Sequence, residues 1–183
     1  MAGSSALSHG GTHLGLGTGM KVAIVYHSES GNTARMAELV ADGCRSVSDS
    51  VEVRLMTVDA PDAEYLRQCK AIIFGSPTYE ATCSWQMKRY LDTAGSELAG
   101  KLAGFFVSQN WPGGGGGSLA EMTMIAAALV RGMLVYSGGI TQGLPYLHLG
   151  AVSCRAPEDR LYRDRCLHLG RVITLKAMEL FPE

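Results

Sequence analysis

The first group of residues with chemical potential lies between an apolar run and a helical pattern. It comprises hydroxyl, amide and carboxylate side chains around one glycine: Ser28, Glu29, Ser30, Gly31, Asn32 and Thr33. Such a turn at the start of a helix offers hydroxyl groups, unpaired N–H groups and a positive dipole end, which together can hold a phosphate. The loop contains no Lys or Arg, which excludes a Walker nucleotide loop. A capped helix after a polar turn is an equally good interpretation, because Ser, Asn and Thr are ordinary capping residues.

A second group follows the third apolar run and contains Pro77, Thr78, Tyr79 and Glu80. Pro77 stiffens the turn, and Tyr79 has an aromatic face that suits stacking on a flat ring. Trp85 lies a few residues further on and is expected in the core of a helix more often than against a ligand. Tyr79 is therefore a candidate for stacking against a planar ligand.

A third group follows the fourth apolar run and consists of Ser108, Gln109, Asn110 and Trp111, then Pro112 and five consecutive glycines, of which Gly113, Gly114, Gly115 and Gly116 are candidate ligand contacts. Glycine lets backbone N–H groups approach a planar ring closely. A flexible linker is the alternative, but five glycines between a buried strand and a helix are costly to order. A bound ligand is one reason to keep them.

Short apolar runs alternate with helical periods along the chain. Strands are predicted at Val22–Tyr26, 51–55, Ala71–Phe74, Leu102–Val107 and Met133–Tyr136, and helices at 33–45, after Pro61, from Trp85, at Leu119–Val130 and from Pro157. The last helix would bury Tyr162, Cys166, Leu169, Ile173, Ala177 and Leu180. This alternation predicts an α/β fold, a parallel sheet with helices on both faces. Ligands of such sheets bind beyond the carboxyl ends of the strands, where the three groups lie.

Composition narrows the class of protein. The 183 residues carry 16 basic and 17 acidic side chains, a net charge of −1, so neither nucleic acid nor a membrane is an expected partner. Five scattered cysteines favour a reducing cytoplasm over a disulfide framework. Residues 1–20 contain no Lys, Arg, Asp or Glu, and we interpret them as a flexible N-terminal extension ahead of one domain at 21–183.

The motifs also carry a family resemblance. Ser28-x-Ser30-Gly31-x-Thr33 resembles the flavodoxin phosphate loop, whose usual form is T-x-T-G-x-T, with serine at two threonine positions. Gly75-Ser76-Pro77-Thr78 and the later Gln86-Met87-Lys88-x-x-Leu91-Asp92 resemble flavodoxin-like NAD(P)H:quinone reductases of the tryptophan-repressor-binding-protein type. The resemblance runs from Lys21 to about Phe181. It implies a flavodoxin-like three-layer fold with a five-stranded parallel sheet.

The resemblance further implies FMN, bound without a covalent link. The first loop would hold its phosphate, Thr78, Tyr79 and Glu80 would line one side of the isoalloxazine, and Gln109, Asn110, Trp111 and the glycines would line the other. The family's usual reaction takes electrons from NAD(P)H through the flavin to a quinone or another small acceptor. A flavodoxin-type electron carrier is the alternative, although a net charge of −1 is unlike the strongly acidic carriers. A third hypothesis is an interaction protein that retains the fold but binds no flavin. Relatives of the reductase type form tetramers, so the resemblance is compatible with a homo-oligomer, either a dimer or a tetramer.

The chain departs from the reductase pattern at two places. Glu80-Ala81 stands where those enzymes usually carry an aromatic-glycine pair, and Arg131 stands where they tend to carry a histidine. Glu80 would lower the flavin potential if it pointed inward, but a solvated loop tip is the stronger expectation. Arg131 is either a helix C-terminal cation or a contact to the cofactor of a neighbouring subunit. His148 is expected to be a packed loop histidine.

Overall fold

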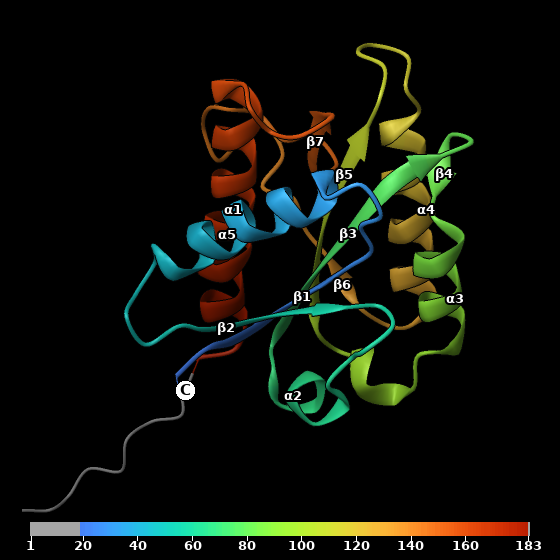
Figure 1. Ribbon diagram of the computed structural model, residues 1–183. Helices are drawn as coiled ribbons and strands as arrows, with labels where there is room; N and C mark the ends of the chain where they lie inside the picture. The colour runs from blue at the N-terminus through green and yellow to red at the C-terminus, as the bar shows by residue number, and fades with distance from the viewer. Residues whose placement is uncertain (1–18, 183) are drawn as a thin grey trace, which may run out of the picture.

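The structure is a computed structural model that describes residues 19–182 (Figure 1). Its strands are β1 Lys21–Tyr26, β2 Glu52–Thr57, β3 Ala71–Tyr79, β4 Thr82–Cys83, β5 Leu102–Gln109, β6 Leu134–Val135 and β7 Ala151–Cys154. Its helices are α1 Asn32–Arg45, α2 Ala63–Gln68, α3 Trp85–Thr93, α4 Gly117–Val130 and α5 Arg160–Leu180, with a 3₁₀ turn η1 at Ser96–Leu98.

The main sheet is parallel and has the order β2-β1-β3-β5, with its fifth position shared by two short strands. β6 pairs with the start of β5, and β7 pairs with its end. The α/β flavodoxin-like fold is therefore confirmed, and this order is one of the two common doubly wound arrangements. The predicted strand at Met133–Tyr136 is confirmed but shorter than expected. Only Leu134 and Val135 form strand there, because Gly138 and Gly139 with φ of 81° and 56° turn the chain away.

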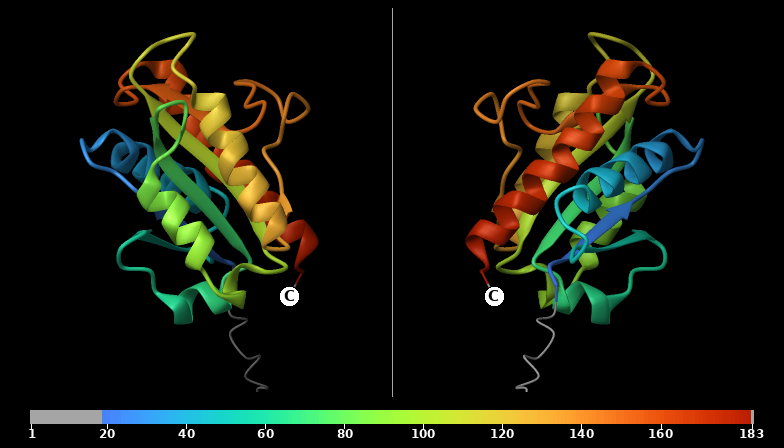
Figure 2. Two further views of the ribbon diagram at one scale, coloured as in Figure 1. Left: turned by 90° about the vertical axis from the view of Figure 1, so that its right-hand side faces the viewer. Right: turned by 90° about the vertical axis from the view of Figure 1, so that its left-hand side faces the viewer.

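Helices cover both faces of the sheet, as the two views of Figure 2 show. The strands alternate between the two cores, as a period of two requires. Ile72, Phe74 and Phe105 face the side that α2, α3 and α4 cover, while Ile73 and Phe106 face α1 and α5. Packing on the two faces of the buried strands thus fixes both helix layers, and with them the loops that follow the strands.

The last helix begins three residues later than predicted, at Arg160, after the extended N-cap Asp159. Cys166, Leu169, Ile173 and Ala177 are buried as expected. The expectation is wrong for Tyr162, which is only half-buried, and for Leu180, which is exposed, because both lie at the ends of the helix beyond its contact with α1.

Most of the expected N-terminal extension lies outside the described residues. Met20 is inside them: it is buried with 8% exposure, and its carbonyl accepts a hydrogen bond of 2.9 Å from the N–H of Glu52. Within residues 19–182, no helix has both the length and the apolar character needed to cross a membrane.

Candidate functional site

Three loops meet at one edge of the sheet. They follow β1, β3 and β5, which are adjacent and parallel, so their carboxyl ends point the same way. In Figure 1 this edge is the upper right of the molecule, where the yellow loop after β5 stands out furthest. The topology therefore brings together the three groups, although about 80 residues separate the start of the first group from the start of the third in the sequence.

The first loop ends in the start of α1. Gly31 is the N-cap and has a left-handed φ of 87°, which glycine adopts without strain. The first helical bond runs from the N–H of Arg35 to the carbonyl of Gly31, so the N–H groups of Asn32 and Thr33 precede it. Ser28 does act as a capping residue, because its hydroxyl accepts from the N–H of Ala34 at 3.2 Å. Glu29 and Ser30 are exposed at the tip.

Direct contacts tie the first loop to the other two. The buried hydroxyls of Thr33 and Ser108 lie 2.9 Å apart, which joins the start of α1 to the end of β5. The hydroxyl of Tyr79 donates to the carboxylate of Glu29 at 2.8 Å. The position of the first loop is thus set by the same residues that were expected to hold a ligand.

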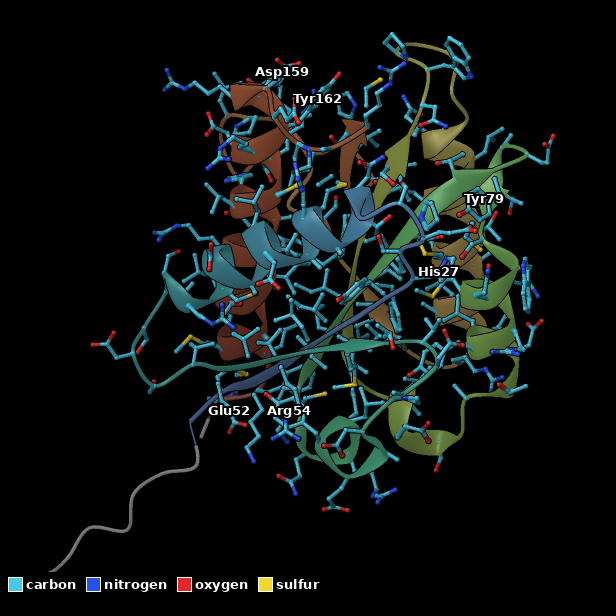
Figure 3. All side chains as sticks on the ribbon, viewed as in Figure 1. His27, Glu52, Arg54, Tyr79, Asp159 and Tyr162 are labelled. Carbon is cyan, nitrogen blue, oxygen red and sulfur yellow. The ribbon has the colours of Figure 1, made fainter. Side chains whose placement is uncertain are left out.

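His27 is a site residue that sequence reasoning did not select. It directly follows β1 and lies beside Tyr79, with the two rings edge-on and their centroids 6.3 Å apart (Figure 3). His27 is 8% exposed, and its Nδ1 finds no hydrogen-bond partner among the described residues. Burial lowers the pKa of His27, and the nearby Asp59 and Glu29 oppose that shift. The imidazole is therefore neutral at neutral pH, and it offers an uncharged group next to the first loop.

The second loop is a two-residue hairpin. Tyr79 pairs with Thr82, and the turn residues Glu80 and Ala81 both have positive φ, 46° and 61°. Such turns favour Asn-Gly or Gly-Gly, because other residues are strained there. The Glu80-Ala81 pair thus takes a conformation that the expected glycine would adopt more easily. The side chain of Glu80 is exposed at the tip of this hairpin.

Ala81→Gly should raise the free energy of unfolding by about 1 kcal/mol, because glycine removes the strain at φ 61°. Denaturant unfolding measures this change. The matched control is Ala99→Gly, since Ala99 is exposed with an ordinary φ of −59°. There glycine should lower the stability by up to about 1 kcal/mol. Equal effects of the two substitutions would contradict the assignment of strain to Ala81.

The glycine run of the third loop is held by close contacts. The Gln109 side chain accepts a 2.8 Å bond from the N–H of Gly117, the first residue of α4. A Cβ on Gly115 would lie 2.5 Å from the Trp111 carbonyl, and one on Gly116 would lie 2.6 Å from the Cα of Ala81. Gly116 is also left-handed, with φ 78°. A larger residue at 116 would therefore separate the second loop from the third, and one at 115 would disturb the third loop itself.

A cavity of about 600 Å³ lies between the second and third loops. Its walls are Thr78, Tyr79, Glu80, Ala81, Asn110, Trp111, Gly114 and Gly115, and seven of these eight belong to the predicted ligand contacts. The residues fit a planar, polar-edged ring. Tyr79 and Trp111 supply aromatic faces, Trp111 is 71% exposed, and the Thr78 hydroxyl is buried with no partner in the described part of the chain.

Other predicted residues lie around this cavity without lining it. Pro77 is half-buried in β3 opposite Ser108, and Gln109 supports the glycine run from behind. Gly113 precedes the lining glycines and has φ 77°. Pro77 and Gln109 thus support the walls of the cavity from the strands behind them.

The structure bears on three secondary expectations. Trp85 is 62% exposed under the guanidinium of Arg89, so its placement in a helix core is wrong. The guanidinium of Arg131 donates hydrogen bonds to the carbonyls of Asp92 and Ala94 at the end of α3. Its positive charge thus lies at the negative end of the α3 dipole. His148 is exposed with a left-handed φ of 49°, so the packed-histidine expectation is wrong.

Comparison with known proteins gives one family. Residues 23–110 match a family model described as a flavodoxin domain. A flavodoxin from Clostridium saccharobutylicum is 42% identical over 88% of this chain and its own full length. An NAD(P)H dehydrogenase (quinone) from Archaeoglobus fulgidus is 30% identical, covering 78% of this chain and 80% of its own. The crystal structure of a flavodoxin, WrbA-like protein from Agrobacterium tumefaciens superimposes with a TM-score of 0.71 at 24% identity, over 87% of this chain and 98% of that one.

Proposed function

The chain belongs to the flavodoxin family, and from this premise we propose that it binds FMN and works as an NAD(P)H-dependent oxidoreductase that reduces a quinone or a similar small acceptor. The observation that carries this proposal is the cavity of about 600 Å³ between Tyr79 and Trp111, beside an uncharged helix start.

The chain's own residues divide the work of holding FMN. Ser28, Ser30, Gly31, Asn32 and Thr33 would bind the phosphate through hydroxyls and N–H groups of the α1 start. Tyr79 and Trp111 would cover the ring, and Gly114 and Gly115 would present backbone groups to its edge. The Thr78 hydroxyl, which lacks a partner in residues 19–182, would donate to or accept from that edge.

FMN supplies the electron-transfer chemistry when it is bound, while the chain orients it and limits its contact with water. The carboxylate of Glu29 accepts a hydrogen bond of 2.8 Å from the hydroxyl of Tyr79, and this bond fixes the position of the phenol. His27, neutral and edge-on to Tyr79, adds no charge near the phosphate loop. The site thus has no cation of its own in the first loop, and backbone dipoles would carry the phosphate charge.

Two observations bear on the electron donor and favour different candidates. The 30% identical relative named NAD(P)H dehydrogenase (quinone) and the net charge of −1 support an enzyme. The 42% identical relative named flavodoxin supports the second candidate, an electron carrier that exchanges electrons with a redox protein. The two candidates differ in whether a nicotinamide nucleotide alone can reduce the bound flavin.

Anaerobic mixing of the FMN-loaded protein with NADH, and separately with NADPH, distinguishes the candidates. The enzyme should lose its visible flavin absorbance within about a second with at least one nucleotide, in line with typical turnover. Free FMN at the same concentration is the control for uncatalysed reduction. If the absorbance persists with both nucleotides and the protein exchanges electrons rapidly with a reduced redox protein, the enzyme hypothesis is overturned and the electron-carrier hypothesis remains.

Two expectations about the setting of the protein also remain proposals. An oligomer is supported by α4, whose exposed face carries Leu119, Met122, Leu129 and Val130 and no charged side chain. A cytoplasmic location is supported by five free thiols, four of them buried.

A further inference from the structure

A second cavity, of about 410 Å³, lies on the other side of the glycine run. Gly114 and Gly115 line both cavities, so the run forms a thin wall between them. The far side of this second cavity includes Glu121 from α4, His148 from the loop before β7, and Arg165 from α5. Its volume falls in the range of small-molecule sites.

Glu121 is an unusual residue for its position. It is 1% exposed in a helix whose other thirteen residues are uncharged, and its Oε1 has no hydrogen-bond partner within the described residues. The carboxyl lies against Gly150, where an added Cβ would be 2.5 Å from Oε1. Burial raises the pKa of Glu121 to about 8, and Arg165 opposes that shift. Its carboxyl therefore holds a proton at neutral pH and can donate a hydrogen bond.

Positive groups line the same cavity as Glu121. The Nε of Arg165 is buried and, in residues 19–182, unpartnered. The start of α4 adds two N–H groups, those of Ser118 and Leu119, because Gln109 takes the N–H of Gly117 and Ala120 bonds to Gly116. These donors lie at the positive end of the helix dipole. Unpaired buried polar atoms are costly, and the two that line this cavity, Arg165 Nε and Glu121 Oε1, indicate a ligand that pairs with them.

The titratable groups around Glu121 favour a ligand with one negative charge. α4 and β5 contribute no other titratable side chain, and β7 contributes only Cys154, whose thiol bonds to the Asn110 carbonyl. The loop before β7 contributes Tyr146 and His148, and α5 contributes Arg165. One guanidinium and one helix start suit a monoanion, and the buried Leu147 beside them suits an apolar body.

We propose that this second cavity binds a small organic carboxylate, held between Arg165, the N–H groups of Ser118 and Leu119, and a hydrogen bond donated by the carboxyl of Glu121. The ligand would sit behind the glycine wall and be separate from the FMN cavity. Binding would be linked to protons, because a Glu121 that loses its proton repels the ligand's charge.

Benzoate is the probe, titrated into the full chain by calorimetry, both without and with added FMN. Wild-type protein should bind one benzoate, and the affinity should fall at least about fivefold between roughly pH 7 and pH 9. Glu121→Gln keeps a donor without an ionisable proton, so its affinity should change less than about twofold over that range. Arg165→Met should weaken binding at least about tenfold, while Arg171→Met, a matched change on the exposed side of α5, should not.

The proposal is overturned if wild-type protein binds no benzoate, if Arg165→Met binds it as tightly as Arg171→Met, or if Glu121→Gln keeps the wild-type pH dependence. If inorganic phosphate binds as tightly as benzoate, the cavity is a general anion site and the proposal of a carboxylate ligand is overturned. A thermal midpoint for each variant shows whether it is folded at the titration temperature. The titration without FMN keeps this result independent of the proposed flavin chemistry.

Discussion

Ser30→Asp should lower the affinity for FMN at least about 100-fold without destabilising the chain. Ser30 is exposed at the tip of the first loop, directly before the N-cap Gly31. A carboxylate there would stand beside the bound phosphate, and two unit charges about 4 Å apart near a protein surface repel by about 4 kcal/mol. The same carboxylate interacts favourably with the α1 dipole, which should stabilise the fold by about 0.3–1 kcal/mol. Binding and stability should therefore change in opposite directions.

Ser96→Asp is the matched control for this experiment. Ser96 is, like Ser30, an exposed serine near the start of a helical turn, here the first residue of η1, but that turn precedes β5 and lies at the opposite edge of the sheet. Fluorescence titration with FMN and thermal unfolding would be measured for both variants. Similar FMN affinities of the Ser30→Asp and Ser96→Asp proteins would contradict the placement of the phosphate at the start of α1.

Glu121→Gln should remove a pH dependence of stability that the wild-type protein carries. The folded chain holds the Glu121 proton up to a pH of about 8, whereas an unfolded carboxyl releases it near pH 4.3. The folded state therefore binds more protons between these values, and the free energy of unfolding falls as the pH rises through the window. From about pH 5 to pH 8 the loss should be on the order of 3 kcal/mol.

The amide of the Glu121→Gln variant has no proton to lose, so the variant should gain stability relative to wild type as the pH rises. Urea unfolding at several pH values measures the difference between the two proteins. Glu38→Gln, on the exposed side of α1, should follow the wild-type curve. A constant difference between Glu121→Gln and wild type from acid to neutral pH would show that Glu121 ionises in its ordinary range.

The fold and the meeting of three loops follow from local patterns in the sequence. Apolar runs such as Ala71–Phe74 and Leu102–Val107 have the length and composition of buried strands, and polar residues after them must lie at their carboxyl ends. Because parallel strands share an edge, Tyr79 and Trp111 could be placed near each other, and the family resemblance implied that they lie on opposite sides of a ring. The cavity that contains both agrees with that placement.

Other features depend on contacts that no local pattern encodes. The fifth strand is divided between β6 and β7, and four residues such as Ala151–Cys154 are too few for a periodic signal. The positive φ of Ala81 follows from the hairpin register and its contact with Gly116. Glu121 did leave a signal, since it is the one charged residue of an otherwise apolar helix, but its burial depends on the packing of α4 against β5.

The glycine run was predicted to stand beside a ligand, and the structure gives it packing roles as well. Gly115 and Gly116 approach Trp111 and Ala81 too closely for any side chain. Gly113 and Gly114 have open space around the position of a Cβ. We therefore expect glycine at 115 and 116 to be required by the fold, and glycine at 113 and 114 to depend on what the cavities hold.

The most direct test of the central claim is a titration of the purified full chain with FMN, followed by the fluorescence of the flavin. Binding between Tyr79 and Trp111 should quench that fluorescence until one FMN is bound per chain, and a Tyr79→Ala, Trp111→Ala double variant should quench it less. Flavin fluorescence that stays at the level of free FMN, with no FMN retained by the protein after gel filtration, would contradict the account.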